Sequence, residues 1–399
     1  MFGLTAIEVF LVIVAIFIVV YWITPQKFSW LPFLLITVLF AVLAFNITPY
    51  DSDDLSRYFK ALNEMRVEGY DGLQRYIRED QFDFDTYRVA AYYVYFLSKL
   101  SNNHWLPFTT MFIVYGLGFY CIYKASVRFN VNKIHLFLAS MFFISTYWYY
   151  DTVSGTRNGL AFAVAFACSY QHLVERKHFI LCYIGYVLAA LTHSAGILPV
   201  LLVIVTELTL NTSGKFLNFV FVFSISGGGV LIRYLSEVSD NDFIQSMAGK
   251  AENHGLGDSL ETGTMFRVNI TVLLIVTLLL IYVSYYFLNS DYTSSLKRLY
   301  KYASSTVYFM IGCMLSGLIF VRFARWILPL IGALLFMIGM QIQRNQINKE
   351  GLTKLTYYSP TKQSIRIKTR SVAYIIYVAY TAVHFWYLCN GSSLYWIMF

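Results

Sequence analysis

Charged side chains are scarce in this sequence. Asp, Glu, Lys and Arg together make up 13% of its 399 residues, whereas a soluble domain carries about 25%. The apolar residues form long blocks, many of about 16 to 22 residues, and roughly 20 apolar residues cross a bilayer as a helix. The scarcity excludes a soluble globular protein and predicts an all-α polytopic membrane protein, in which residues 1–399 form a single helical domain.

Cysteine is also rare, and its spacing argues against two kinds of site. The five cysteines all lie in or beside apolar blocks, and none forms a CxxC pair, so we expect neither disulfides nor cysteine metal sites. The first apolar segment lacks the basic region and the small-residue cleavage site of a signal peptide. We expect a retained first helix, no cofactor and no metal, although the acidic cluster described below could bind a cation.

The apolar blocks predict about 12 transmembrane helices and one shorter segment. Segment 86–100 has an apolar core of about 12 residues, which is short of the roughly 17 that a span needs, and it carries Arg88 and Lys99 near its ends. We therefore predict a re-entrant or interfacial helix there. The predicted spans are 4–23, 31–47, 107–123, 134–150, 158–174, 178–193, 195–209, 216–236, 268–289, 302–321, 326–341 and 371–388.

The charges of the loops predict the side on which each loop lies. If 86–100 does not cross, one set of loops holds 17 Lys and Arg residues, and the other holds 13 together with 17 Asp and Glu residues. Basic loops stay in the cytoplasm, so the first set, with a flexible basic loop at 342–370, is predicted to be cytoplasmic. The acidic loops 48–106 and 237–267 are then outside, and 59–81 predicts amphipathic helices on the membrane surface. If 86–100 crossed, every later loop would change sides. The net charge of +8 follows this sorting and does not indicate nucleic-acid binding.

Polar residues that are unusual at a membrane edge gather on the predicted outer side. A carboxylate cluster in YDSDDLSRY follows the second span, and an arginine opens the fifth span in SGTRNGLAFAVAFA. A histidine closes the sixth span in LAALTHSAGIL, and two arginines lie in FVRFARW, the connection between spans ten and eleven. Charges at such places are costly and usually functional. The residues are Asp51, Asp53, Asp54, Arg57, Tyr58, Arg157, His193, Arg322 and Arg325.

Each of these residues also has a purely structural explanation. Asp53 and Asp54 could be N-caps of a helix over 55–65. Arg157 could be a snorkelling anchor, and His193 could be a hydrogen-bonded residue at a helix end. The arginines of FVRFARW could anchor lipid headgroups. These explanations leave open why opposite charges meet on one side of the membrane.

Acids, guanidinium groups and an imidazole together suit glycosyl transfer. Arginine binds phosphate bidentately and stays charged, and a carboxylate can take the proton of an attacking hydroxyl. A histidine can orient a group or relay a proton. The set fits the attack of a sugar hydroxyl on an anomeric carbon whose leaving group is a lipid-linked phosphate or pyrophosphate.

Two motifs in this chain resemble the EpsG-type polysaccharide polymerases. One is an acidic-x-x-x-Tyr signature after the second span, here Asp54-Leu-Ser-Arg-Tyr58. The other is GTRNGLAFAVAFACSYQHLVERKHFILCYIGYVLAALTHSAGILPVLLV, with an arginine opening an Ala-rich span, a short basic turn, a second span and then Leu-Ala…His-Ser. The resemblance covers about residues 45–200, and beyond them only FVRFARW is similar to a family feature. The family is similar in role to the Wzy O-antigen and capsule polymerases and related in architecture to the GT-C membrane glycosyltransferases.

The resemblance implies a GT-C-like bundle in the bacterial cytoplasmic (inner) membrane, with its active site facing the periplasm or exterior. It implies an enzyme that joins oligosaccharide repeat units carried on undecaprenyl pyrophosphate, for lipopolysaccharide O-antigen, capsule or exopolysaccharide. Its partners would be that lipid-linked oligosaccharide, membrane lipid and, in some systems, a chain-length regulator protein. The candidate catalytic residues are Asp53, Asp54, Tyr58, Arg157 and His193, and either Asp53 or Asp54 is favoured as the base. The candidate substrate-binding residues are Asp51, Arg57, Arg88, Asn158, Arg322 and Arg325.

Two other functions share part of this pattern. A GT-C-like transferase that adds one sugar from a polyprenyl-phosphate donor needs much of the same chemistry. A lipid-oligosaccharide flippase would resemble transporters, which often have internal repeats and charges at the bilayer midplane. The sequence has no internal repeat and almost no Lys or Arg within its spans, so the polymerase is favoured.

Overall fold

The computed structural model describes residues 6–49, 53–210, 271–278, 294–312, 317–353 and 375–386. Every regular element in these residues is helical. The chain divides into two compact units, which are described separately. The first consists of Met1–His172, Arg176–Val200 and Tyr380–Phe399, and the second of Leu173–Glu175 and Leu201–Ala379.

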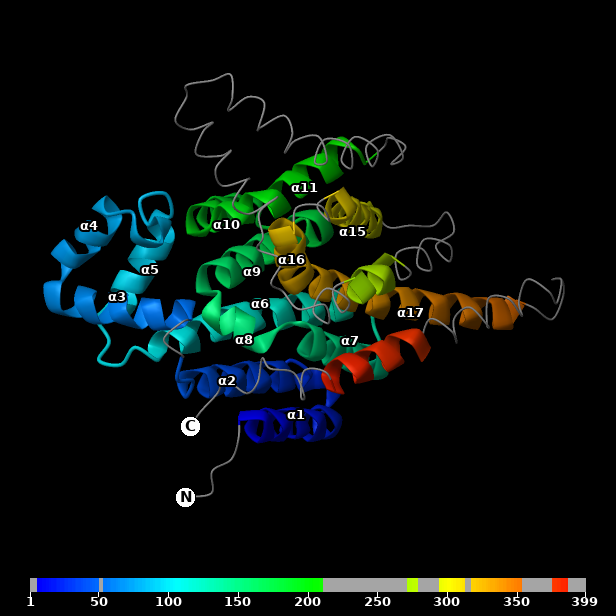
Figure 1. Ribbon diagram of the computed structural model, residues 1–399. Helices are drawn as coiled ribbons and strands as arrows, with labels where there is room; N and C mark the ends of the chain where they lie inside the picture. The colour runs from blue at the N-terminus through cyan, green and yellow to red at the C-terminus, as the bar shows by residue number, and fades with distance from the viewer. Residues whose placement is uncertain are drawn as a thin grey trace. The chain divides into compact units, whose positions relative to one another are not determined.

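The first unit contains most of the described helices (Figure 1). Its predicted spans at 4–23, 31–47, 107–123, 158–174 and 178–193 each correspond to a helix. The span predicted at 195–209 corresponds to α11 (Ile197–Leu208), which begins in this unit. The other helices are α1 (Ala6–Ile23), α2 (Leu31–Phe45), α3 (Asp54–Glu68), α4 (Tyr70–Arg78), α5 (Arg88–Ser98), α6 (Trp105–Arg128), α7 (Lys133–Thr146), α8 (Tyr149–Ser154), α9 (Thr156–Tyr170) and α10 (Phe179–Thr192).

An aromatic core holds the long helices of the first unit together. α2 packs against α1 and α6, and α6 packs against α9, which in turn packs against α10. The buried Phe40 ring on α2 lies at 5.3 Å from Phe10 of α1, 4.9 Å from Tyr115 of α6 and 5.5 Å from Tyr149 of α8. Such ring pairs add about 0.5–1.5 kcal/mol each beyond the burial of their area. Part of the large aromatic content therefore serves to pack the helices against one another.

The prediction of one helix over 134–150 is wrong. α7 ends at Thr146, because Tyr147 has an extended backbone (φ −85°, ψ 108°), and the short helix α8 begins two residues later. The Tyr115 hydroxyl donates a 3.0 Å hydrogen bond to the Tyr147 carbonyl. It thereby satisfies a buried carbonyl that the interrupted helix leaves without a donor. The break lets α8 and α9 begin at the end of the unit where α3 lies, since α3 contacts α8.

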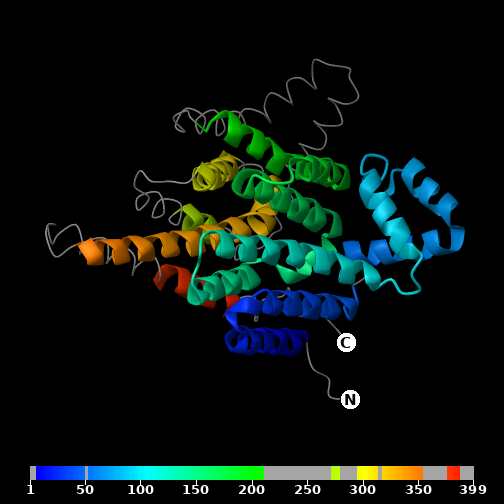
Figure 2. The ribbon, with the colours of Figure 1, turned by 180° about the vertical axis from the view of Figure 1, so that it is seen from behind.

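Residues 54–98 form the helices α3, α4 and α5, where the sequence predicts amphipathic helices over 59–81 and a short helix over 86–100. α3, α4 and α5 gather beyond one end of α2 and α6 in both views (Figures 1 and 2). α3 and α4 meet at Gly69, whose φ of +66° glycine adopts without a steric penalty. α5 packs against α3, α4 and α10. It has 11 residues, so it is about 16 Å long, roughly half the thickness of the bilayer core. This length fits a helix that does not cross.

The second unit contains α15 (Ser294–Gly312), α16 (Gly317–Trp326), α17 (Leu328–Thr353) and a helix at 271–278. α16 packs against α15 and α17. The rings of Phe336 and Tyr377 stack at 3.4 Å, and an ion pair of 3.2 Å joins Arg298 to Glu207. Tyr377 belongs to the apolar helix Ile375–Trp386, in the region predicted as the span 371–388.

Two predictions for the second unit need correction. FVRFARW is not a loop connection, because it forms the end of α16, which meets α17 at a bend of 46°. Pro329 explains the bend, since it has no N–H to donate to the carbonyl four residues earlier and its ring clashes there. α17 continues to Thr353, so residues 342–353 are helical and not a flexible loop. Good helix formers in this stretch, such as Arg344 and Lys349, favour the extension.

The number of membrane crossings stays a prediction. Within the described residues, α6 is long and apolar enough to cross alone, and the bent pair Phe320–Trp326 and Leu328–Ile342 would add a second crossing. Several shorter apolar helices, such as Leu31–Phe45 and Phe179–Thr192, accompany them. The predicted features at 216–236, 237–267 and 354–370 and most of 268–289 lie outside the described residues.

Candidate functional site

Arg157 lies in the first turn of α9 and is held by the loop between α4 and α5. Its side chain is only 18% exposed. The guanidinium donates a hydrogen bond to the backbone carbonyl of Phe82 and lies 3.7 Å from the carboxylate of Asp83. It also lies 5.5 Å from the ring centroid of Tyr87. A snorkelling arginine keeps its head in water, so these contacts argue against that explanation.

The loop that meets Arg157 has an unusual backbone. Three of its residues have positive φ angles, and one of them is Phe82 at +60°. A bulky residue rarely adopts this conformation, which costs on the order of 1–3 kcal/mol. The Phe82 ring stacks on Tyr58 (4.9 Å, 13° between planes) and on Tyr76 (6.2 Å, 12°). The stacked rings hold Phe82 so that its carbonyl accepts the hydrogen bond from Arg157.

Tyr58 projects from α3 into this cluster and is buried. Burial raises the pKa of Tyr58 to about 12, although the charge of Arg157 and a side-chain hydrogen bond with it act in the opposite direction. The phenol is therefore protonated at neutral pH. Tyr58 can donate a hydrogen bond, but it cannot act as a general base.

His193 joins the same cluster through Tyr87. The residue ends α10 in an extended conformation, and its Nδ1 atom accepts a 3.0 Å hydrogen bond from the Ala195 N–H. Its ring stacks on Tyr87 at 5.1 Å, and the Tyr87 hydroxyl donates to Ser194 Oγ at 2.8 Å. His193 is thus a hydrogen-bonded helix-end residue, as the structural explanation expected. Because Nδ1 is an acceptor, the neutral ring carries its proton on Nε2.

Asp53 and Asp54 differ in what their carboxylates contact. Asp53 occupies the N-cap position of α3, but its side chain makes no capping hydrogen bond and instead accepts one from the Tyr150 hydroxyl of α8. Asp54 forms an ion pair with Arg57, and both side chains are more than half exposed. The capping explanation therefore fails for the side chain of Asp53. α8 directly precedes the helix that carries Arg157, so Tyr150 links Asp53 to that region.

The other candidates lie at different places. Arg88 pairs with Asp85 on the exposed surface. The Oδ1 atom of Asn158 is buried and has no hydrogen-bond partner within the residues that the structure describes. Arg322 and Arg325 belong to α16 of the second unit, so their convergence with Arg157 stays a prediction. Asp51 lies outside the described residues.

Sequence reasoning missed four residues of this region, namely Phe82, Asp83, Tyr87 and Tyr150. The two aromatic types are so common in the chain, with 33 Tyr and 34 Phe, that a single ring carries little information. One signal was available: the segment EDQFDFD at 79–85 is dense in acids and phenylalanines within an otherwise apolar chain. We name Tyr58, Phe82, Asp83, Tyr87 and Arg157, with His193 stacked on Tyr87, the arginine cluster.

The arginine cluster is suited to an anion whose charge develops during a reaction. Arg157 carries a permanent positive charge at the N-terminus of a 15-residue helix, where the helix dipole also favours negative charge. Phe82, Tyr87 and Asp83 fix the guanidinium before a ligand arrives. Within the described residues, no group of three His, Cys, Asp or Glu side chains could hold a metal ion.

Comparison with known proteins shows a family match. The model of the EpsG family matches residues 29–381, which include the arginine cluster and both aspartates. No curated protein and no solved structure matches the chain. The GT-C-like arrangement of the bundle therefore stays a prediction.

Proposed function

Because the chain belongs to the EpsG family, whose match indicates a membrane-bound polysaccharide polymerase, we propose that it joins oligosaccharide repeat units carried on undecaprenyl pyrophosphate. The growing chain passes from its own lipid carrier to the non-reducing end of the next lipid-linked unit. The reaction is a glycosyl transfer that releases undecaprenyl pyrophosphate. The product is an O-antigen, a capsule or an exopolysaccharide.

The proposed reaction breaks one bond and forms one. A hydroxyl oxygen of the acceptor sugar attacks the anomeric carbon of the donor, and the bond between that carbon and the pyrophosphate oxygen breaks. The leaving pyrophosphate keeps the electron pair, and a carboxylate takes the hydroxyl proton. The protein's tasks are to hold the pyrophosphate, to place the carboxylate and to exclude water.

The arginine cluster is the observation that supports this proposal most. Arg157 is fixed by Asp83, Tyr87 and the Phe82 carbonyl, so its guanidinium needs little reorganisation as charge builds on the leaving group. Asp83 offsets part of the positive charge, but Arg157 retains further N–H donors, because a guanidinium has five. Tyr58 and His193 act as positioning residues around it.

Asp53 is the proposed general base. Its carboxylate is oriented by the hydrogen bond from the Tyr150 hydroxyl. Asp54 instead forms an ion pair with Arg57 on the exposed surface. An oriented carboxylate can meet an acceptor hydroxyl in one geometry, which raises the rate of proton transfer.

We place the reaction at the outer face of the bacterial inner membrane. The loop charges support this side, because 48–106 is acidic and the opposite loops are basic. The lipid-linked substrate is then the main partner, and a chain-length regulator would meet the protein on that side.

Substitution of Arg157 tests the proposal. Cells that carry Arg157→Ala are expected to lose the polysaccharide length ladder, and Arg157→Lys is expected to restore only a small part of it, because lysine cannot bind phosphate bidentately. Arg78→Ala on α4 is the matched control. Arg78 is exposed and makes no ion pair within the described residues, so this variant should keep the full ladder.

The measurement needs equal amounts of inserted protein in each strain. A normal ladder from inserted Arg157→Ala protein would overturn the proposal. Product analysis with the wild-type protein separates it from single-sugar transfer, since polymerisation gives a ladder and single transfer gives one mass step.

A further inference from the structure

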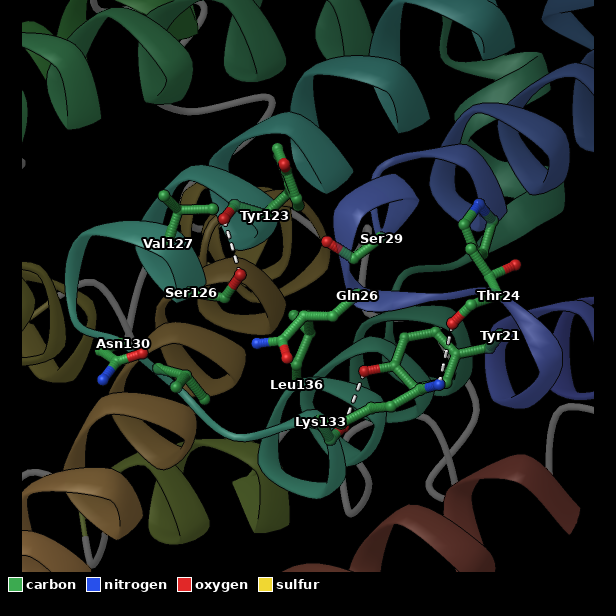
Figure 3. Close-up of a pocket in the computed structure, with 12 residues that line it drawn as sticks. Tyr21, Thr24, Gln26, Ser29, Tyr123, Ser126, Val127, Asn130, Lys133 and Leu136 are labelled. Atoms are coloured by element: carbon green, nitrogen blue, oxygen red, sulfur yellow. Dashed lines mark hydrogen bonds between the residues drawn. The ribbon is translucent and has the colours of Figure 1, made fainter.

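A polar pocket lies at the opposite end of α6 from the arginine cluster. At the first end of α6, His104 contacts Phe59 of α3 at 5.1 Å. The last turn of α6, 24 residues on and about 36 Å away, lines a cavity of about 240 Å³. The other walls are the segment after α1, the start of α2 and the start of α7 (Figure 3). All of these elements belong to the first unit.

Lys133 joins two walls of this pocket. Its ammonium donates to the carbonyl of Trp22 at the end of α1 at 3.0 Å. It also donates to the Thr24 carbonyl at 3.1 Å, and the Tyr21 hydroxyl donates to the Lys133 carbonyl at 2.6 Å (Figure 3). An ammonium has three N–H donors, so one remains for an occupant. The pocket is therefore preformed, with a positive charge in its wall.

Three neutral side chains offer further donors to the pocket. Gln26, Ser29 and Asn130 line it. None of these side chains makes a hydrogen bond within the described part of the chain. Two amide groups and a hydroxyl beside an ammonium form a donor set for oxygen atoms of an anion.

The charged residues in the segments that line the pocket have one sign. Segments 20–36 and 120–137, which supply most of its walls, contain Lys27, Lys124, Arg128 and Lys133 and no Asp or Glu. Cations near a membrane surface attract anionic headgroups at about 1 kcal/mol each. The field at this end of the unit therefore favours a negatively charged occupant.

The apolar surroundings indicate where the rest of the occupant lies. Trp22, Phe28 and Trp30 are all more than 40% exposed beside the pocket, and exposed aromatic side chains are typical of the membrane interface. A second set of exposed apolar residues recurs at helical spacing along α1 and forms one stripe on the face opposite the pocket-lining Tyr21, so α1 presents an apolar surface to the membrane. This stripe consists of Val12, Ile16, Val19 and Ile23.

We propose that this pocket binds the headgroup of an anionic glycerophospholipid. Its phosphodiester oxygens accept hydrogen bonds from Lys133, Gln26 and Asn130, and its acyl chains extend into the surrounding bilayer beside Trp22, Phe28 and Trp30. The site is separate from the arginine cluster and takes no part in sugar transfer. It ties α1, α2, α6 and α7 together and so stabilises the folded protein.

The test is a ligand-dependent melting experiment on the full-length protein purified in detergent. Dioctanoyl phosphatidylglycerol is expected to raise the melting temperature, because a ligand that binds only the folded state stabilises it. Dioctanoyl phosphatidylcholine and inorganic phosphate are the comparison ligands, and each is expected to give a much smaller shift. A double variant, Gln26→Ala with Asn130→Gly, is expected to weaken phosphatidylglycerol binding by roughly tenfold.

Two controls make the result decisive. The side chains of Gln26 and Asn130 make no hydrogen bonds within the described residues, and glycine adopts the positive φ of 47° at position 130 without a steric penalty. The double variant should therefore melt like wild type without lipid. Lys60→Gln on α3 removes a cation at the other end, where the Lys60 side chain is 78% exposed, and should leave lipid binding unchanged. Equal shifts with phosphatidylcholine, an equal shift with inorganic phosphate alone, or unchanged binding by the double variant would each overturn the proposal.

Discussion

At the scale of single residues, the arginine cluster is stabilised by aromatic contacts that offset local strain. The positive φ of Phe82 costs on the order of 1–3 kcal/mol. Its stacks on Tyr58 and Tyr76 return about 0.5–1.5 kcal/mol each, and the contact of Arg157 with the Tyr87 ring adds about 0.5–2 kcal/mol. The favourable contacts together are comparable to the cost, so the conformation that presents the Phe82 carbonyl to Arg157 can persist.

The different surroundings of the two aspartates lead to a prediction at this scale. Asp53→Asn is expected to lower the rate of polymerisation by about 100-fold or more, which is the usual effect of losing a general base. Asp54→Asn is expected to keep most of the activity, because Asp54 faces solvent with Arg57. The measurement is chain growth by purified protein on a lipid-linked repeat unit.

The two variants control for each other, since both remove one carboxylate in the same turn with little change of shape. Their melting temperatures in detergent should agree within about 2 °C. The assignment of the base would be wrong if Asp54→Asn were the inactive variant and Asp53→Asn were active.

At the scale of elements, the arginine cluster depends on how α3 and α4 meet. Arg75 of α4 donates to Glu64 and Glu68 of α3, each at 2.8 Å, and the Tyr76 hydroxyl donates to Glu64 at 2.9 Å. Tyr76 is one of the rings on which Phe82 stacks. The ion pairs between the two helices therefore support the loop that holds Arg157.

Loss of Arg75 is expected to destabilise the protein in a pH-dependent way. The hydrogen bond from Arg75 lowers the pKa of Glu64 below its ordinary value of 4.5. A carboxylate with a depressed folded-state pKa stabilises the fold above its unfolded-state pKa, and this stabilisation disappears as the pH falls through the folded-state value. Arg75→Gln should thus melt about 2 °C below wild type at pH 7, and the difference should shrink below pH 4.5.

Arg78→Gln provides the matched variant for this measurement. It changes the same residue type one turn later on α4, where the side chain is exposed and unpaired within the described residues. It should melt like wild type at every pH. A constant difference for Arg75→Gln across the pH range would contradict the role given to Glu64.

Sequence periodicity predicted the existence of most elements better than their ends. Apolar blocks correctly indicated helices in the first unit and a short one at α5. The break at Tyr147 was not predictable, because a tertiary hydrogen bond from Tyr115 stabilises it and hydropathy is continuous across it. The bend before Pro329 could have been predicted from the sequence, since proline bends or interrupts helices. The sequence analysis instead interpreted FVRFARW as a loop.

At the scale of the whole molecule, charge is distributed unevenly between the two ends of α6. Within the first unit, acids and the arginine cluster lie at the α3 end of α6, and the segments that line the pocket at the other end carry only basic charges. This asymmetry is what membrane sorting of loops predicts. The two ends are therefore proposed to bind different ligands. The α3 end binds a lipid-linked pyrophosphate, and the pocket end binds a phospholipid headgroup.

The sequence indicated part of the candidate site and could not indicate the rest. Arg157, His193 and Tyr58 stood out because a charge or polar group at a membrane edge is rare, and these three do share contacts through Tyr87 and Phe82. Tyr87 and Phe82 themselves could not be identified from the sequence, since composition does not distinguish an aromatic residue in the site from one in the core. Their roles follow only from three-dimensional contacts.

The central claim is that Arg157 holds the pyrophosphate of the leaving carrier. Its most direct test is the affinity of purified full-length protein for undecaprenyl pyrophosphate in detergent, with undecaprenol as the ligand that lacks the charged group. Arg157→Ala is predicted to weaken binding of the pyrophosphate at least about tenfold and to leave binding of undecaprenol unchanged. Equal affinity of wild type and Arg157→Ala for undecaprenyl pyrophosphate would contradict the account.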